Sequence, residues 1–158
     1  MARRSAWQIA DDHGSVKRAE IEAALAKLFL PAGTSPPART GKDAVTIAQF
    51  RQRFPDDEAC CTYLFRLRDG KKRRCSRCGK TGRWYKLASR PAYSCQCGNH
   101  FFPMAGTRMH FTRAPLLKWF FGVYLLTRDA ALSAKELQQS LDINYHTARR
   151  MKREVLSK

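Results

Sequence analysis

Apolar positions along the first part of the chain indicate one helix followed by a long interruption. Over 15–30 the apolar residues approximate a stripe at helical spacing, which predicts an amphipathic helix. The next stretch, 31–43, contains three prolines and two glycines, a composition typical of a linker or an exposed loop. We therefore expect a separate N-terminal helical appendage over 1–30 and a linker over 31–46.

A second helical element is predicted over 47–70, leading into a cysteine-rich region. Its helix start is expected at 55–58, where a proline precedes three acidic residues that the positive end of a helix dipole would stabilise. Helical spacing then predicts one buried face, made of Cys60, Tyr63, Leu64 and Leu67. Because free cysteine behaves as a small core side chain, we interpret Cys60 and Cys61 as core residues.

The last third of the chain contains three predicted helices. The apolar run 116–126 includes Lys118 and is much shorter than the ~20 residues that span a membrane, so we interpret it as a buried helix that begins after Pro115. Residues 133–136 form a capping box that opens a further helix. Asn144 is a suitable N-cap for the final helix.

The last two of these helices have the layout of a helix-turn-helix, within a helical region assigned to 105–158. Asp142 stands in the short break, at the place often given to glycine, and Ala148, Met151 and Val155 form the apolar stripe of the final helix. In such a motif the N-terminal residues of the second helix contact bases and later ones contact phosphates. The candidates for bases are Tyr145, His146 and Arg149, and those for phosphates are Arg150, Lys152 and Arg153. An ordinary helical hairpin with a solvated basic face is the alternative.

Four cysteines have the spacing of a structural zinc site. The pattern C-x2-C-x16-C-x-C comprises Cys75, Cys78, Cys95 and Cys97, and two close pairs separated by about 15–20 residues are typical of zinc sites. A hairpin of 84–87 with 91–94 is expected between the pairs. We therefore predict a zinc ribbon over 71–104, with Zn²⁺ held by four sulfurs.

Three alternatives to this four-sulfur site remain. His100 lies close after the second pair, which is one residue short of the usual spacing, so its imidazole could replace one thiol. The four thiols could also stay reduced without a metal, or form two disulfides.

The net charge of the chain indicates what kind of partner it binds. The chain carries 30 Lys and Arg against 13 Asp and Glu, a formal net charge of +17, and such a balance points to nucleic acid. Eleven of these bases lie within 66–90, with Asp69 as the one acid there. The residues of this run that we expect to contact DNA are Lys71, Lys72, Arg73, Arg74 and Arg77. No membrane partner is expected, since neither a basic amphipathic helix nor an apolar anchor stands out.

The order of these motifs is similar to that of a known family. The relevant stretches within 47–156 are FPDDEAC, YLFRLR, the C-x2-C-G pair, the Y-x-C motif with its second cysteine, PMAGTRMHFTRAPLLKWFFGVYLLT and SAKELQQSLDINYHTARRM. They resemble the N-terminal zinc-ribbon region of bacterial insertion-sequence transposases of the ISXO-like type. The resemblance implies that the four cysteines bind zinc, and that the ribbon and helix-turn-helix bind the element's terminal inverted repeats.

The same resemblance bears on catalysis. In that family a downstream RNase-H-like domain with a DDE carboxylate set cuts and joins DNA using divalent metal. The sequence ends at Lys158, where that domain would begin, and its acids show no constellation suited to two metals. We therefore expect a non-catalytic, truncated or stand-alone DNA-binding protein in the bacterial cytoplasm, associated with the nucleoid. Residues 1–43 have no counterpart in the family pattern.

Two other functions stay open. The chain could be a fragment of a complete DDE transposase, which is an enzyme, or its ribbon could bind RNA or protein. The sequence does not determine the DNA target or the oligomeric state, and a homo-oligomer is one of the states left open.

Overall fold

The computed structural model describes residues 16–29, 44–45, 47–68, 70–110 and 112–157, and helices account for about half of these residues. The elements in chain order are β1 (Val16–Lys17), α2 (Arg18–Phe29), β2 (Ala44–Val45), α3 (Ile47–Arg53), α4 (Asp57–Leu67), a 3-10 turn η1 (Gly70–Lys72), β3 (Trp84–Lys86), β4 (Tyr93–Cys95), β5 (His100–Phe101), α5 (Leu116–Arg128), α6 (Ala134–Leu141) and α7 (Tyr145–Leu156). The prediction of a mainly α protein with a small β region is confirmed. None of the described helices has the length and apolar character needed to cross a membrane.

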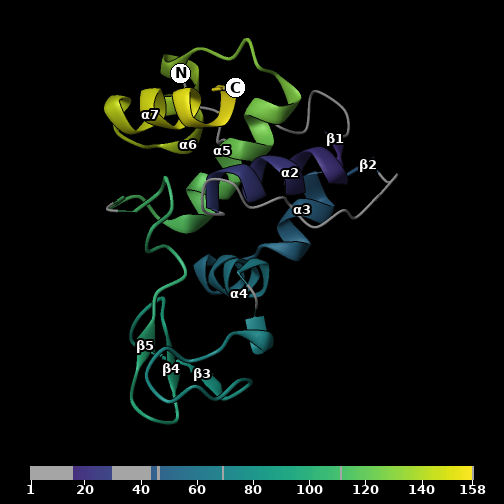
Figure 1. The fold of residues 1–158 in the computed structure, drawn as a ribbon. Helices are drawn as coiled ribbons and strands as arrows, with labels where there is room; N and C mark the ends of the chain where they lie inside the picture. The colour runs from purple at the N-terminus through teal and green to yellow at the C-terminus, as the bar shows by residue number, and fades with distance from the viewer. Residues whose placement is uncertain (1–15, 30–43, 46, 69, 111, 158) are drawn as a thin grey trace.

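Helix α5 is the centre of the larger part of the molecule. It packs against α2, α4, α6 and α7 (Figure 1). Aromatic rings fill the space between α5 and α3: the Phe50 and Tyr124 centroids are 4.9 Å apart, as are those of Phe54 and Phe120. The predicted burial of the apolar run is confirmed, because Trp119 and Phe120 are fully enclosed.

Helix α2 packs within this body of helices. Ile21 and Leu25 are buried in the same hydrophobic cluster as the α5 side chains, and α2 contacts both α5 and α7. The expectation of a separate helical appendage therefore does not describe the 18–29 segment. Its apolar stripe is covered by helices that lie about a hundred residues later in the sequence. Apart from β1, the rest of the predicted appendage and most of the predicted linker fall outside the described residues.

The predicted helix over 47–70 is divided into α3 and α4. The division falls at Phe54–Asp56, where Pro55 would break a continuous helix, and Asp56 then acts as the N-cap, accepting a 2.8 Å hydrogen bond from the Ala59 N–H. Cys60 and Cys61 are buried in α4, and burial raises the pKa of both thiols. Their interpretation as core residues is confirmed.

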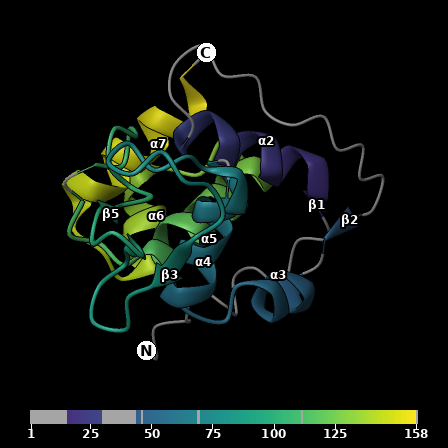
Figure 2. The ribbon, with the colours of Figure 1, turned by 60° about the horizontal axis from the view of Figure 1, so that its bottom comes forward.

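A three-stranded antiparallel sheet in the order β3-β4-β5 forms the other end of the molecule. Figure 2 brings this end forward. One face of the sheet packs on α4, where the rings of Tyr93 and Phe65 stack with centroids 3.8 Å apart. The β3–β4 hairpin agrees with the sequence prediction, whereas β5 was not predicted.

The two C-terminal helices have the caps that the sequence predicted. Ser133 and Glu136 form the capping box of α6, and the Asn144 side chain accepts from the His146 N–H at the start of α7. Asp142, between them, has the left-handed backbone with φ of 49°.

Helix α7 approaches α5 closely at Gly122. A Cβ at this position would overlap the Met151 Sδ and lie 3.1 Å from the Leu141 Cδ1. The absence of a side chain at 122 therefore allows α6 and α7 to sit against α5 as they do.

Candidate metal centre and basic surfaces

Four thiols converge between the two loops that flank the sheet. The Sγ atoms of Cys75, Cys78, Cys95 and Cys97 all lie within 4.8 Å of one another. Two separations join the pairs crosswise: 3.6 Å from Cys75 to Cys97 and 3.7 Å from Cys78 to Cys95. A tetrahedron with metal–sulfur bonds of about 2.3 Å has edges of about 3.8 Å. The cluster therefore has the size and shape of a four-sulfur metal site.

The first loop, or knuckle, is closed by hydrogen bonds around Cys75. Its carbonyl accepts from the Gly79 N–H at 2.9 Å, and its own N–H donates to the Lys80 carbonyl at 2.9 Å. Gly79 has a φ of 69°, which glycine adopts without the penalty that a Cβ would bring. The glycine after the first cysteine pair thus turns the chain so that Cys75 and Cys78 point to one place.

The second knuckle compensates for its shorter cysteine spacing with a tighter turn. The Gly98 N–H donates to the Cys95 carbonyl at 2.8 Å, so this turn is one residue shorter than the turn closed by the Gly79 N–H and the Cys75 carbonyl. The Cys95 N–H donates to the Asn99 carbonyl at 2.7 Å. His100 follows in β5, opposite Ser94. Because Cys95 points to the other face of the sheet, His100 lies away from the cluster, and the four-sulfur alternative is the one that the geometry supports.

Asn99 links the two knuckles and was missed in the sequence. Its side-chain amide donates to the Cys75 Sγ at 3.4 Å and to the Ser76 Oγ at 3.1 Å. Such a donor stabilises a thiolate and fixes the orientation of a ligand. Nothing in the sequence distinguishes this asparagine from one that only terminates a turn.

The cysteine environments shift two pKa values in opposite directions. Hydrogen bonding from the Cys78 backbone, followed by that from the Asn99 amide, lowers the pKa of Cys75 to about 6. At Cys95 the Cys97 backbone also favours the thiolate, but burial and the hydrogen bonds with neighbouring thiols outweigh it and raise the pKa to about 11. A cation bound by all four sulfurs must therefore displace the Cys95 proton.

Acidification is expected to release the metal from this site. Because a bound metal requires thiolates, it lowers their pKa values further, so protons compete increasingly as the pH falls. Cys75, with its pKa lowered to about 6, stays ionised to a lower pH than Cys95, so release should be complete only once the pH is well below about 6. A colorimetric zinc indicator, read during a titration from neutral pH, measures this. Release that is independent of pH would contradict thiolate ligation.

The donor set suits a closed structural site. Four thiolates select zinc or iron among the common metals. With every ligand from the protein, no position is left for a reacting water.

The basic residues predicted at the ribbon are divided between intramolecular contacts and solvent. Arg73 is half-buried, with its guanidinium 3.7 Å from the centre of the Phe101 ring. Arg74 donates to the Gly79 carbonyl at 3.0 Å and Arg77 to the Cys97 carbonyl at 3.4 Å, although both side chains are exposed. Lys72 is exposed, and the side chain of Lys71 lies outside the described part of the chain.

The predicted contact residues of α7 lie mainly on its exposed side. Tyr145 is 45% exposed, and His146, Arg149 and Arg153 are also exposed. Arg150 instead donates from one guanidinium nitrogen to the Arg108 carbonyl at 2.8 Å and the His110 carbonyl at 3.4 Å. Arg150 therefore ties α7 to the segment that precedes α5, a role that its sequence position did not suggest.

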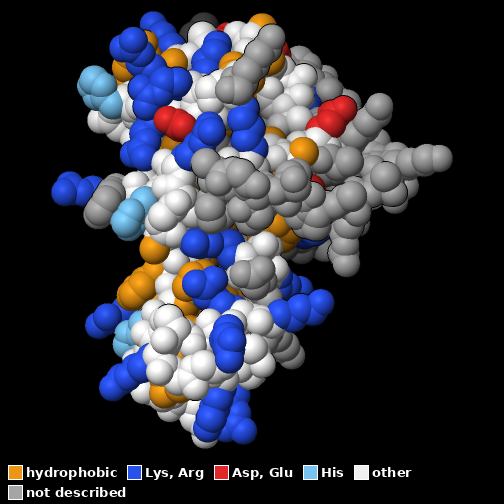
Figure 3. All heavy atoms as spheres, in the orientation of Figure 1, with side chains coloured by type: hydrophobic (Ala, Val, Ile, Leu, Met, Phe, Trp, Pro, Cys, Tyr) orange, Lys and Arg blue, Asp and Glu red, His pale blue; other side chains and the backbone are white. Residues whose placement is uncertain are grey.

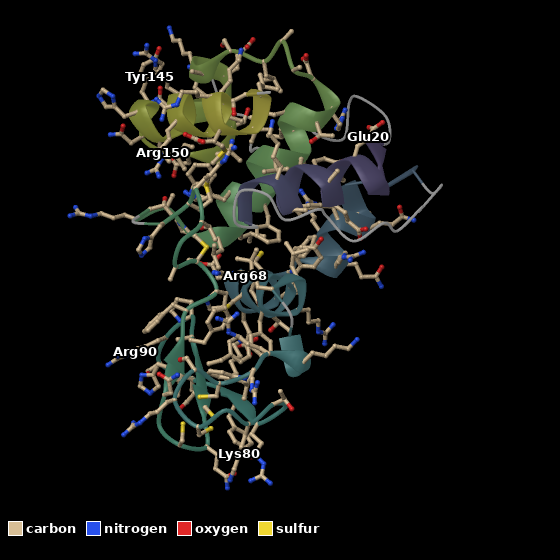
Figure 4. All side chains as sticks on the ribbon, in the orientation of Figure 1. Glu20, Arg68, Lys80, Arg90, Tyr145 and Arg150 are labelled. Atoms are coloured by element: carbon tan, nitrogen blue, oxygen red, sulfur yellow. The ribbon has the colours of Figure 1, made fainter. Side chains whose placement is uncertain are left out.

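The two basic regions lie at opposite ends of the molecule. Figure 4 shows Tyr145 and Arg150 at the helical end and Lys80 at the tip of the cysteine region. Lys and Arg side chains are frequent at both ends in the view of Figure 3, where acidic side chains are few. Residues 70–128 contain no Asp or Glu at all. Cationic side chains are therefore presented at both ends of the molecule, and Figure 3 shows others between them.

No family model, no curated protein and no solved structure matches the chain. Functional conclusions therefore depend on the site itself.

Proposed function

We propose that the protein is a zinc-containing double-stranded DNA-binding protein. The observation that carries this proposal is the acid-free stretch 70–128, which includes the four-thiol cluster. A metal held by four thiolates orders a chain segment without activating water, so its role is to fix a surface. Carboxylates from outside this stretch reach it at Lys86, which pairs with Glu58, and at Arg108, which pairs with Glu154 at 3.8 Å. Because the stretch is cationic and contains no carboxylate of its own, its suitable partner is a polyphosphate.

We further propose that α6 and α7 form a helix-turn-helix with α7 as the helix that enters the major groove. Its N-terminal side chains, Tyr145, His146 and Arg149, are exposed together. The opposite side of α7 is occupied, since Ala148 and Met151 are buried against the helical core. An exposed, basic helix N-terminus on a rigid support is what base reading requires.

We also propose that the chain is the DNA-binding portion of an ISXO-like insertion-sequence transposase. The proposal rests on the motifs of 47–156, and it makes terminal inverted repeats the expected target. Among the described residues, the thiol cluster is the one group of side chains arranged to hold a metal ion. The proposed activity is therefore binding, and the cutting and joining of DNA would belong to a DDE domain.

Selection from random DNA duplexes tests this function. The full chain, purified with zinc, is expected to enrich a defined sequence, and binding to the enriched duplex should weaken steeply as salt rises. Structured RNA of equal length serves as the comparison. A preference for RNA, or binding to duplex that does not depend on salt, would favour the RNA- or protein-binding alternative.

Replacing Arg149 with alanine tests the assignment of α7. If Arg149 contacts a base edge, the variant should lose about 1–3 kcal/mol of binding free energy at the enriched sequence and less on unrelated duplexes. Fluorescence anisotropy at fixed salt measures both losses. Arg51→Ala is the matched control, because Arg51 is an exposed arginine on a different helix, α3. An equal loss on all sequences would make Arg149 a phosphate contact.

A further inference from the structure

The three-stranded sheet has one face toward α4 and another toward solvent. The register places Tyr85 opposite Ser94, and Ser94 opposite His100, so the three side chains lie in a row on the solvent face. Phe102 comes directly after β5, two residues past His100, and continued alternation of side chains would place it on the same side. We call the face formed by Tyr85, Ser94, His100 and Phe102 the outer sheet face.

This face exposes aromatic rings that the fold does not use. Tyr85 is 61% exposed and Phe102 is 41% exposed, and they are two of the four large hydrophobic residues exposed in the described chain. In contrast, the rings on the inner face are enclosed: Tyr93 stacks on Phe65, and Phe101 packs against Trp84 with centroids 6.0 Å apart. Core packing therefore explains the inner rings but gives no reason for Tyr85 and Phe102.

The spacing of the outer rings leaves room for flat ligands. Adjacent strands are about 4.8 Å apart, so residues on β3 and β5 are separated by about 10 Å across the central strand. Ser94, a small side chain, occupies the position between Tyr85 and His100. A planar group can thus lie against the ring of Tyr85 or that of His100 without meeting a bulky side chain on β4.

The charges around the outer sheet face favour an anionic ligand. Arg83 is exposed and stands two residues before Tyr85 on the same side of the hairpin. Arg90, also exposed, extends from the β3–β4 loop (Figure 4). With no carboxylate anywhere in 70–128, an acidic ligand with flat rings is better matched than an apolar protein surface. Nucleotides combine both properties.

We propose that the outer sheet face binds unpaired nucleotides, with bases stacked on Tyr85 and Phe102 and phosphates near Arg83 and Arg90. The bases of a duplex already stack on one another, so only a single strand or an unpaired segment can offer free base faces to these rings. This inference rests on the proposed nucleic-acid function and adds a second ligand form to it. Helix α7 takes duplex, and the outer sheet face takes single strand.

Binding of a single-stranded oligothymidylate of about ten nucleotides tests the proposal, since site sizes of about 4–16 nucleotides are usual for such surfaces. In fluorescence anisotropy with the full zinc-loaded chain, Tyr85→Leu should weaken binding by about five-fold to a hundred-fold, as should Phe102→Leu. Tyr85→Phe keeps the ring and should stay within about two-fold of the wild type. Unchanged zinc content and circular dichroism would show that the variants are folded.

The salt dependence provides a second readout. Removing a ring removes no phosphate contact, so Tyr85→Leu should shift the plot of log K against log salt without changing its slope, whereas Arg83→Ala should make the slope shallower. Duplex affinity should be the same for Tyr85→Leu and the wild type.

The outcomes separate this inference from the function on which it rests. Duplex binding by the wild type combined with equal single-strand affinity of Tyr85→Leu and the wild type would overturn the inference alone. No binding to any nucleic acid would overturn both. If Tyr85→Leu instead changes the sedimentation behaviour of the protein and leaves single-strand affinity intact, the face is a protein interface, and the inference is wrong.

Discussion

Replacing Cys78 with serine is expected to abolish metal binding and to unfold the cysteine region. A serine hydroxyl stays protonated near neutral pH and is a poor ligand for zinc, so the tetrahedron loses one of its four corners. Binding of structural zinc supplies about 10–16 kcal/mol in zinc-finger peptides, and this energy is folding energy. The loss should therefore exceed what the short strands β3, β4 and β5 contribute by themselves. Metal analysis of the purified protein and limited proteolysis within 71–104 measure the two effects.

A matched control for this variant lies in α4. Cys61→Ala removes a buried thiol outside the cluster, so it should keep about one zinc per chain while losing some packing energy. The wild type should also lose protease resistance within 71–104 when a strong chelator is added. A wild-type protein with no stoichiometric zinc, or a Cys78→Ser variant that retains it, would contradict the four-sulfur site.

Replacing Phe120 with alanine is expected to cost about 3–5 kcal/mol of unfolding free energy. Phe120 is fully buried at the junction of three helices, with its ring centroid 4.9 Å from that of Phe54 and 5.8 Å from that of Tyr63. Alanine would leave a cavity that the surrounding rings cannot close. Urea denaturation followed by circular dichroism at 222 nm, a standard wavelength for helix, measures the change.

The same substitution on the surface provides the comparison for Phe120. Phe102→Ala removes a phenylalanine that is 41% exposed, so its cost should be much smaller, within about 1 kcal/mol. Equal losses for the two variants would mean that the aromatic cluster between α3, α4 and α5 does not stabilise the fold as its packing indicates.

Local signals were the part of the fold that the sequence could predict. The capping box at Ser133, the N-cap at Asn144 and the left-handed Asp142 each depend on a few neighbouring residues. The cysteine cluster is similar, because spacing alone brings each pair together and a single four-sulfur site needs both pairs.

The sequence could not predict the contacts between segments that lie far apart in the chain. The apolar stripe of α2 fits a solvent-facing appendage as well as a core helix until α5 is placed against it. Tyr93 follows a run of arginines and lysines in the sequence, and alternation within β4 turns it onto Phe65. Arg73 and Arg150 show the same limit for the site: both were predicted to contact DNA, and both are engaged with a ring or with carbonyls of their own chain.

The close approach at Gly122 has a consequence for how α7 could change during evolution. The orientation of α7 is fixed on its buried side, where Met151 fills the space that a methyl group at 122 would take. A single added carbon there would displace the Met151 side chain and press on Leu141, and any resulting shift of α7 would redirect its outward side chains together. If α7 binds DNA as proposed, its target preference could thus change through a position on the buried side of the helix, while the outward side chains themselves stay the same.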